Sequence, residues 1–160
     1  MKLRHHIQPG DIGELIRLHG IIYEQEYGFD KTFEAYVAKG IADFVLNYNP
    51  KKERLWLAEM DNLIVGSIAI VKASDEEAQL RWYLVTPSFR NKGIGKELMR
   101  KAIDFCWQKK YKRIFLWTTG ELEAAANVYI KNGFVKSEEI RHVIWGDMRT
   151  EERYERELGF

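Results

Sequence analysis

The sequence predicts a single α/β domain over residues 1–160, in which a mixed and mostly antiparallel sheet is flanked by helices. Three observations lead to this prediction. Short apolar segments that favour strands alternate with longer segments of helical spacing, in the order β-α-α-β-β-β-α-β-α-β-β. No linker or low-complexity stretch divides the chain. At 160 residues with 46% apolar content, the chain is long enough to bury a core and too apolar to be disordered.

The first part of the chain is expected to form a short extended segment and two helices. Pro9-Gly10 ends the extended segment, and Asp11 can cap a helix whose apolar positions run toward Tyr23. A second set of apolar residues holds helical spacing over residues 33–47. Pro50 lies just beyond it and excludes a longer helix.

The rest of the chain is expected to build the sheet and two further helices. Asp61-Asn62 indicates a tight turn between two strands, and Gly133 stands where a left-handed helix cap is expected. The expected strands are residues 55–60, 63–71, 79–86, 113–118, 134–145 and 152–158, and the expected helices are residues 94–109 and 121–131.

A basic glycine loop, Arg90-Asn91-Lys92-Gly93-Ile94-Gly95, joins the third strand of this sheet to a helix. The first turn of a helix leaves N–H groups unpaired, and glycine lets a bound anion approach the backbone, so the loop predicts a phosphate cradle. One residue between the glycines excludes a nucleotide-triphosphate P-loop. Position 98 is leucine, whereas the dinucleotide fingerprint has its third glycine there.

The pattern R-x-x-G-x-G resembles the pyrophosphate loop of the GNAT acetyltransferase superfamily, and residues 129–134 resemble the Y-x-x-x-G-F signature of its last helix. The resemblance covers nearly the whole chain. It implies a GNAT-like fold with a splayed central parallel strand pair. It also implies acetyl-CoA as the ligand, and transfer of an acetyl group to a primary amine of a small molecule or protein by direct attack in a ternary complex.

The region from His19 to Gly28 further resembles GNAT domains found fused to MarR-type regulators. The sequence contains no winged-helix segment, so DNA binding is not carried over from that resemblance. A formal net charge of +1 also argues against nucleic acid as the main partner.

By the same resemblance, the cofactor is bound mainly by main-chain groups. The amides after Arg90 would hold the pyrophosphate, with lysine and arginine side chains adding charge, and the strand before the loop would pair with the pantetheine arm. The expected cofactor-binding residues are Leu84, Val85, Arg90, Asn91, Lys92, Gly93, Ile94, Gly95 and Lys96.

Tyr129 is the candidate general acid, because it matches the family tyrosine four residues before Gly133. A phenol stays protonated at neutral pH and can return a proton to the leaving thiolate of coenzyme A. The alternative is a packed aromatic side chain on the inner face of a helix.

Two positions depart from the family pattern. Leu122 stands where many members carry an asparagine that contacts pantetheine, and Gln79 stands where some carry a glutamate base. The base is therefore open among ordered water and the side chains Glu26, Glu76, Glu77 and His142. The departures keep a second class of function open, a non-catalytic acyl-CoA-binding module or regulator with the same fold.

The resemblance places the acceptor pocket between the first helices and the last strands. Aromatic and acidic side chains there suit a small amine, although the same rings could simply pack in the core. The expected lining residues are Tyr23, Glu26, Tyr27 and His142, with Trp145 and Asp147 beside them.

The remaining expectations concern metal, compartment and assembly. Cys106 is the only cysteine and is expected to be a buried core thiol, so neither a disulfide nor a cysteine-based zinc site is expected. The adjacent His5 and His6 do not suggest a metal site. The start of the sequence has no signal-peptide pattern and no stretch approaches a membrane span, which favours the cytoplasm.

A homodimer is possible. The aromatic residues of the last segments either form a dimer edge or close the monomer; they are Trp145, Tyr154 and Phe160.

Overall fold

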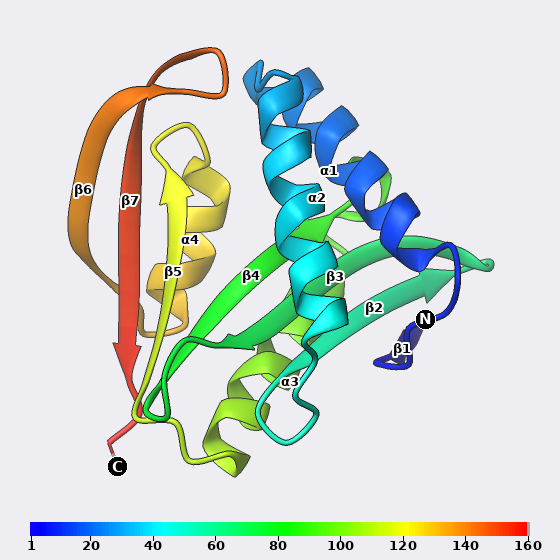
Figure 1. The fold of residues 1–160 in the computed structure, drawn as a ribbon, viewed down its shortest axis with the longest axis vertical. Coiled ribbons are helices and arrows are strands. Elements are labelled where there is room, and N and C mark those ends of the chain that lie inside the picture. Colours follow the sequence, from blue (N-terminus) through cyan, green and yellow to red (C-terminus); the bar gives the residue numbers. More distant parts are fainter. Residues whose placement is uncertain (160) are drawn as a thin grey trace.

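The computed structural model describes residues 1–159, which form one sheet with helices on both faces (Figure 1). The strands are β1 (Lys2–Arg4), β2 (Arg54–Met60), β3 (Leu63–Lys72), β4 (Glu77–Val85), β5 (Arg113–Thr119), β6 (Val135–Ile144) and β7 (Asp147–Glu157). The helices are α1 (Asp11–Tyr27), α2 (Lys31–Leu46), α3 (Ile94–Gln108) and α4 (Glu123–Lys131), with a 3-10 turn, η1 (Pro87–Phe89), before α3. The order of elements and the fold class agree with the sequence prediction.

The seven strands that the model describes lie in the order β1-β2-β3-β4-β5-β7-β6. Every neighbouring pair is antiparallel except β4 and β5, which are parallel. The parallel pair follows from the connection, because α3 crosses over between β4 and β5.

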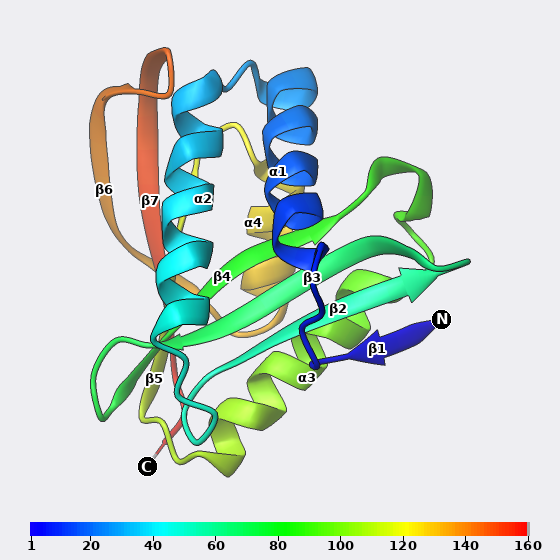
Figure 2. The same ribbon diagram turned by 45° about the vertical axis from the view of Figure 1, so that its right-hand side comes forward.

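Two hydrophobic clusters fill the two sides of the sheet. Side chains of β3 alternate between them: Ile68 and Ile70 pack with α3, whereas Ala69 packs with α1 and α2. Figure 1 shows α1 and α2 in front of the sheet and α4 behind β5, and Figure 2 shows α1 and α2 lying side by side. Helices on both faces thus explain why consecutive residues of β2 and β3 are buried.

The parallel strands β4 and β5 part after three residues. Pairing runs from Glu77 with Arg113 to Gln79 with Phe115 and then ends, while β5 continues along β7 as far as Thr119. The two strands diverge in Figure 1. This divergence is the splayed pair that the sequence resemblance implied.

A β-bulge at Trp82 interrupts the alternation of side chains that a regular strand would show in β4. Trp82 has a φ of 50°, and the pairing of β3 with β4 shifts register between Ser67 and Ala69. Leu80 therefore packs on the α3 side, whereas Trp82 packs on the α1 and α2 side. The bulge is held in place by the Ser67 hydroxyl, which donates a hydrogen bond of 2.6 Å to the carbonyl of Trp82.

Several details at the ends of elements also differ from expectation. Asp11 is not a helix cap: Gly10 occupies that position, and the Asp11 carboxylate instead accepts hydrogen bonds from Arg4 at 2.7 and 2.8 Å. Helix α4 begins at Glu123, with Leu122 before it. The last strand begins at Asp147 rather than at 152, because Trp145-Gly146 forms a tight turn with φ of 53° and 95°.

The expected burial of Cys106 is confirmed, since its side chain lies in the core at 0% exposure. Tyr154 is also buried, and the Trp145 ring packs on Phe29 and Phe33, so both side chains make contacts within the chain. Phe160 lies outside the described residues. None of the helices in residues 1–159 has the length and apolar character needed to cross a membrane.

Candidate active site

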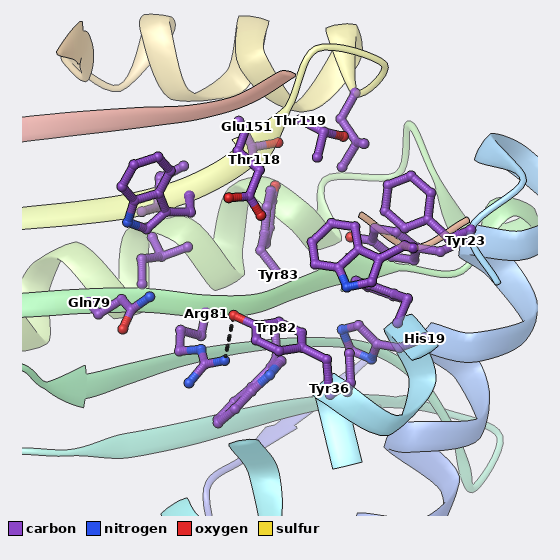
Figure 3. A pocket seen from close by; sticks show the side chains of 18 of the residues that line it. His19, Tyr23, Tyr36, Gln79, Arg81, Trp82, Tyr83, Thr118, Thr119 and Glu151 are labelled. Atoms are coloured by element: carbon purple, nitrogen blue, oxygen red, sulfur yellow. Dashed lines mark hydrogen bonds between the residues drawn. The ribbon is translucent and has the colours of Figure 1, made fainter. Parts of the chain in front are cut away.

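A cavity lies where β4 and β5 diverge, and α1, α2, β7 and the Trp145-Gly146 turn complete its walls. Figure 3 shows Arg81, Tyr36 and His19 along one side of it, and Thr118 and Glu151 along the opposite side. Most of the remaining surface is aromatic. The site is therefore a mainly apolar cavity with a few polar groups, which is the usual form of a small-molecule site.

The glycine loop forms an open helix N-terminus at one end of β4. Gly93 is the residue before α3, with a φ of 85°, and no side chain of residues 1–159 caps this end of the helix. A Cβ at Gly95 would lie 2.6 Å from the Tyr83 hydroxyl oxygen, so only glycine lets the first turn of α3 pack this closely on β4. The free amides and the helix dipole suit the diphosphate of a nucleotide cofactor.

The charged side chains of the loop are divided between two roles. Lys96 is exposed beside these amides, and Lys92 lies over the Phe89 ring at 5.1 Å. Arg90 instead donates two hydrogen bonds to Glu26, at 2.7 and 2.6 Å, and one to the Val85 carbonyl at 3.0 Å. Arg90 thus ties the end of α1 to the loop, and its charge is balanced within the protein.

The ion pair with Arg90 holds the Glu26 carboxylate outside the cavity. The hydrogen bonds from Arg90 lower the pKa of the Glu26 carboxyl group, and Glu26 does not line the cavity. Leu84 and Val85 lie beyond the last pairing of β4 with β5, so their main chain borders the gap that β5 leaves open.

Tyr129 reaches the cavity from α4, of which it is the only buried residue. Its ring lies among Tyr83, Phe134 and Tyr154, with centroid distances of 6.1, 6.0 and 6.0 Å. Burial raises the pKa of Tyr129 well above its usual value. Its hydroxyl has no hydrogen-bond partner within residues 1–159, so a protonated donor is left available to a ligand.

Of the remaining residues expected to line the acceptor pocket, Tyr23 lines the cavity, whereas Tyr27 and His142 do not. Tyr23 lines the cavity, where its ring stacks on Phe33 at 4.7 Å, and burial raises its pKa. Tyr27 packs behind it with a centroid distance of 5.5 Å. His142 is on β6, its Nε2 3.3 Å from Glu151, and is not part of the lining.

Glu151 is the carboxylate that sequence reasoning missed. It lies on β7 opposite Thr119, and it is the only acidic side chain among the described residues that line the cavity. The expected last strand began at residue 152, and a strand with polar residues at most positions has no alternation from which its inner face can be read.

Three buried polar atoms that lack a hydrogen-bond partner belong to residues lining this cavity. They are His19 Nε2, Thr118 Oγ1 and Thr119 Oγ1. His19 Nδ1 lies 2.8 Å from the Leu15 carbonyl oxygen, and because a carbonyl can only accept, Nδ1 carries the hydrogen and Nε2 presents a lone pair. Burying an unpaired polar group costs about 1–3 kcal/mol, so three around one cavity indicate a polar ligand or bound water.

Arg149 holds the far wall of the cavity in place, and sequence reasoning did not single it out. Its side chain is 4% exposed and donates to the carbonyls of Ile144 at 3.0 Å and Trp145 at 3.2 Å on the turn. It also donates to the Gly28 carbonyl at 3.3 Å and lies over the Phe29 ring at 4.2 Å. The end of α1 and the β6–β7 turn are thereby joined by one buried cation.

Comparison with known proteins agrees with this geometry. A family model described as "Acetyltransferase (GNAT) family" matches residues 18–134. The protein described as "Probable N-acetyltransferase camello" from Xenopus tropicalis is 29% identical over 119 residues, which are 72% of this chain and 53% of that protein. The chain spans about half or less of the length of the curated relatives it matches.

Two solved structures show the fold. An acetyltransferase from Streptococcus agalactiae superposes with a TM-score of 0.77 at 22% identity, covering 98% of each chain. A GNAT family acetyltransferase from Elizabethkingia anophelis, solved with acetyl-CoA bound, gives a TM-score of 0.67 at 20% identity, covering 98% of this chain and 97% of that one.

Proposed function

Because the chain belongs to the acetyltransferase (GNAT) family, we propose that it is an acetyl-CoA-dependent N-acetyltransferase. It transfers an acetyl group to a primary amine of a small molecule or a protein by direct attack in a ternary complex. The observation that carries the proposal is the gap between β4 and β5, which has the uncapped α3 at one end and Tyr129 beside it.

The residues present fit acetyl-CoA. The amides from Asn91 to Lys96 are available for the pyrophosphate, and Lys92 and Lys96 add positive charge. The main chain of Leu84 and Val85 borders the gap and can pair with the pantetheine arm. When bound there, acetyl-CoA supplies an activated acetyl thioester.

We assign the base to Glu151, acting directly or through a water molecule. None of the four side chains considered from sequence lines the cavity. Glu26 is paired with Arg90, Glu76 with Lys112 at 2.9 Å, and Glu77 with Arg113 at 3.2 Å. His142 keeps a supporting role, because its Nε2 lies 3.3 Å from the Glu151 carboxylate.

The transfer then needs two proton movements at named atoms. Glu151 accepts a proton from the acceptor amine, whose nitrogen forms the new C–N bond as the C–S bond breaks. The Tyr129 hydroxyl donates a hydrogen bond, and finally its proton, to the departing sulfur. The high pKa of the buried phenol opposes full transfer, so the hydrogen bond itself carries part of the stabilisation.

The first test separates the cofactor from other nucleotides. Thermal stabilisation is measured with acetyl-CoA, CoA, ATP and NAD, because a ligand at about a hundredfold its Kd adds about 2.7 kcal/mol to stability. Acetyl-CoA and CoA are expected to raise the melting temperature. Stabilisation by ATP or NAD alone would refute the proposal.

The second test separates an enzyme from a binding module. Thiol release from acetyl-CoA is followed with a panel of amines. Tyr129→Phe and Glu151→Gln are each expected to lower turnover by about 10²-fold or more while leaving acetyl-CoA binding intact. Unchanged turnover in either variant removes that residue from its role.

A non-catalytic acyl-CoA-binding module is the second candidate. The observation that favours it is that Gln79 and Leu122, the two departures from the family pattern, both line the cavity. Stabilisation by acetyl-CoA without thiol release to any amine would support this second function.

Three finer predictions from the sequence remain proposals. They are a single-domain chain, a homodimer, and kinship with GNAT domains fused to MarR-type regulators. Light scattering coupled to size exclusion measures the mass in solution and tests the dimer directly.

A further inference from the structure

The bulge in β4 turns two consecutive side chains, Arg81 and Trp82, toward α2. A Cβ at Gly40 on α2 would lie 3.0 Å from Arg81 Nη2 and 3.1 Å from Trp82 Cζ2, so both side chains meet the helix at that glycine. In a regular strand they would point to opposite faces. Glycine in a helix interior costs about 1 kcal/mol relative to alanine, and at Gly40 it leaves room for the guanidinium of Arg81.

The guanidinium group lies among aromatic rings. Arg81 Nη2 donates to the Tyr36 hydroxyl at 3.1 Å, and Arg81 Cζ lies 4.7 Å from the Trp82 ring centroid and 5.5 Å from that of Tyr36. These contacts fix the plane of the guanidinium while neutralising none of its charge. Tyr36 accepts from Arg81, so its own O–H remains available as a second donor.

Arg81 has no anionic partner. Within residues 1–159, no carboxylate lies at ion-pair distance from it, whereas arginines such as Arg4, Arg90 and Arg113 each contact at least one. Arg81 also lines the cavity, which surface cations such as Arg141 do not. A planar cation held in position and left unpaired at a ligand cavity is suited to bind a carboxylate in two-point fashion.

The cavity therefore has opposite charges on opposite walls. Arg81 and Tyr36 lie on the α2 side, and Glu151 lies on the β7 side (Figure 3). The rings of Tyr23, Phe33 and Trp145 are part of the lining as well. A molecule with an amine, a carboxylate and an apolar portion matches all three features.

We propose that the acetyl acceptor is a free amino acid, whose carboxylate is bound by Arg81 and Tyr36 while its amine faces Glu151. The proposal rests on the proposed acetyltransferase function and narrows its acceptor. A protein lysine does not satisfy it, because a lysine side chain brings an amine without a carboxylate.

The test compares glycine and each standard L-amino acid that carries a primary α-amine with its own α-carboxamide in the thiol-release assay with acetyl-CoA. The pair has nearly the same shape and differs in the negative charge. For at least one amino acid, kcat/KM is expected to exceed that of the amide by about tenfold or more.

Variants then locate the effect. Arg81→Met keeps an apolar stem over Trp82 and is expected to lower kcat/KM for the amino acid about 10- to 100-fold, mainly through KM, while changing the amide less than about twofold. Tyr36→Phe keeps the ring and is expected to have a smaller effect in the same direction. Arg141→Met, on the exposed face of β6, is the control for loss of an arginine charge.

Three outcomes overturn the proposal. These are an amide that matches its acid in the wild type, equal losses on acid and amide in Arg81→Met, and acceptance of simple amines by an enzyme that turns over no amino acid. All three leave the proposed function standing, since acetyl transfer is observed in each. Failure of acetyl-CoA to bind is a failure of the proposed function instead, and is detected separately by calorimetry. If Arg81→Met has a much lower melting temperature than the wild type, the wild-type comparison of acid with amide and the Tyr36→Phe variant still test whether the acceptor carboxylate is recognised.

Discussion

The buried imidazole of His19 predicts a specific loss of stability in acid. Burial lowers its pKa from 6.5 to about 4, although the hydrogen bond to the Leu15 carbonyl partly opposes this. The unfolded chain therefore takes up a proton at a pH where the folded protein does not. Folding stability falls as the pH drops from about 6.5 to about 4 and then levels off.

The magnitude follows from the two pKa values. One pKa unit corresponds to 1.36 kcal/mol, so the lowering from 6.5 to about 4 amounts to about 3 kcal/mol of stability lost across that range. His19→Phe removes the titration and keeps a ring to stack on Tyr23, which lies 5.8 Å away between centroids. The measured quantity is the difference in unfolding free energy between wild type and variant, so groups common to both, such as Asp11, cancel.

The assay is urea denaturation of both proteins at several pH values between 7.5 and 4. The wild type is expected to lose about 3 kcal/mol relative to His19→Phe over this interval, whatever the offset between them at pH 7.5. His6→Phe, at an exposed position, is the control for replacing an imidazole by a phenyl ring. Parallel curves for wild type and His19→Phe would refute the reasoning, as would a nuclear magnetic resonance titration that finds His19 protonated near pH 6.5.

Three further predictions follow from close contacts and burial. Gly95→Ala is expected to lower the stability of the fold by about 1–2 kcal/mol and to weaken acetyl-CoA binding, because its Cβ would meet Tyr83. Gly13→Ala, in a helix with nothing within 4 Å of the added Cβ, is expected to raise stability by up to about 1 kcal/mol. Thermal melts measure the stability of both variants, and calorimetry measures acetyl-CoA binding. Arg149→Met is expected to cost about 3 kcal/mol in urea denaturation, since it leaves several carbonyls without their donor; a loss no larger than that of a surface arginine would contradict the role of Arg149. Burial raises the pKa of the Cys106 thiol, so a disulfide reagent is expected to label the native protein at least about 100-fold more slowly than the denatured one, and equal rates would contradict its burial.

The parts of the site that depend on local sequence were predictable. The loop before α3 needs glycine where the backbone turns left-handed and where β4 comes close, and these needs are visible as Gly93 and Gly95. Tyr129 is found by its distance in sequence from Gly133, which has a φ of 85° and directly follows the C-cap residue of α4. Within one turn or one helix, spacing along the chain determines spacing in the molecule.

The parts that depend on two or more elements were not predictable from pattern. The sequence places His19 on the buried face of α1, because it follows the helical spacing of the apolar residues. That spacing does not show that its Nε2 lacks a hydrogen-bond partner. Glu151 enters the site only because the Trp145-Gly146 turn starts β7 at Asp147 and sets its pairing with Thr119. A one-residue change of register would have turned it to the other face of the sheet.

The position of Arg81, which we propose binds the acceptor, was also not predictable from the sequence pattern. Alternation in β4 places Arg81 and Trp82 on opposite faces, and a left-handed tryptophan is not a conformation that local preference predicts. Tertiary contacts impose it: the Ser67 hydroxyl binds the Trp82 carbonyl, the Trp82 ring packs on Phe44, and Gly40 leaves space for the guanidinium. Loss of any one of these three contacts is expected to shift the Arg81 side chain while leaving α3 in place. Gly40→Ala therefore tests the argument most gently, because it should raise KM for an amino acid and leave acetyl-CoA affinity unchanged. If both constants changed together, the bulge would serve the cofactor site rather than the choice of acceptor.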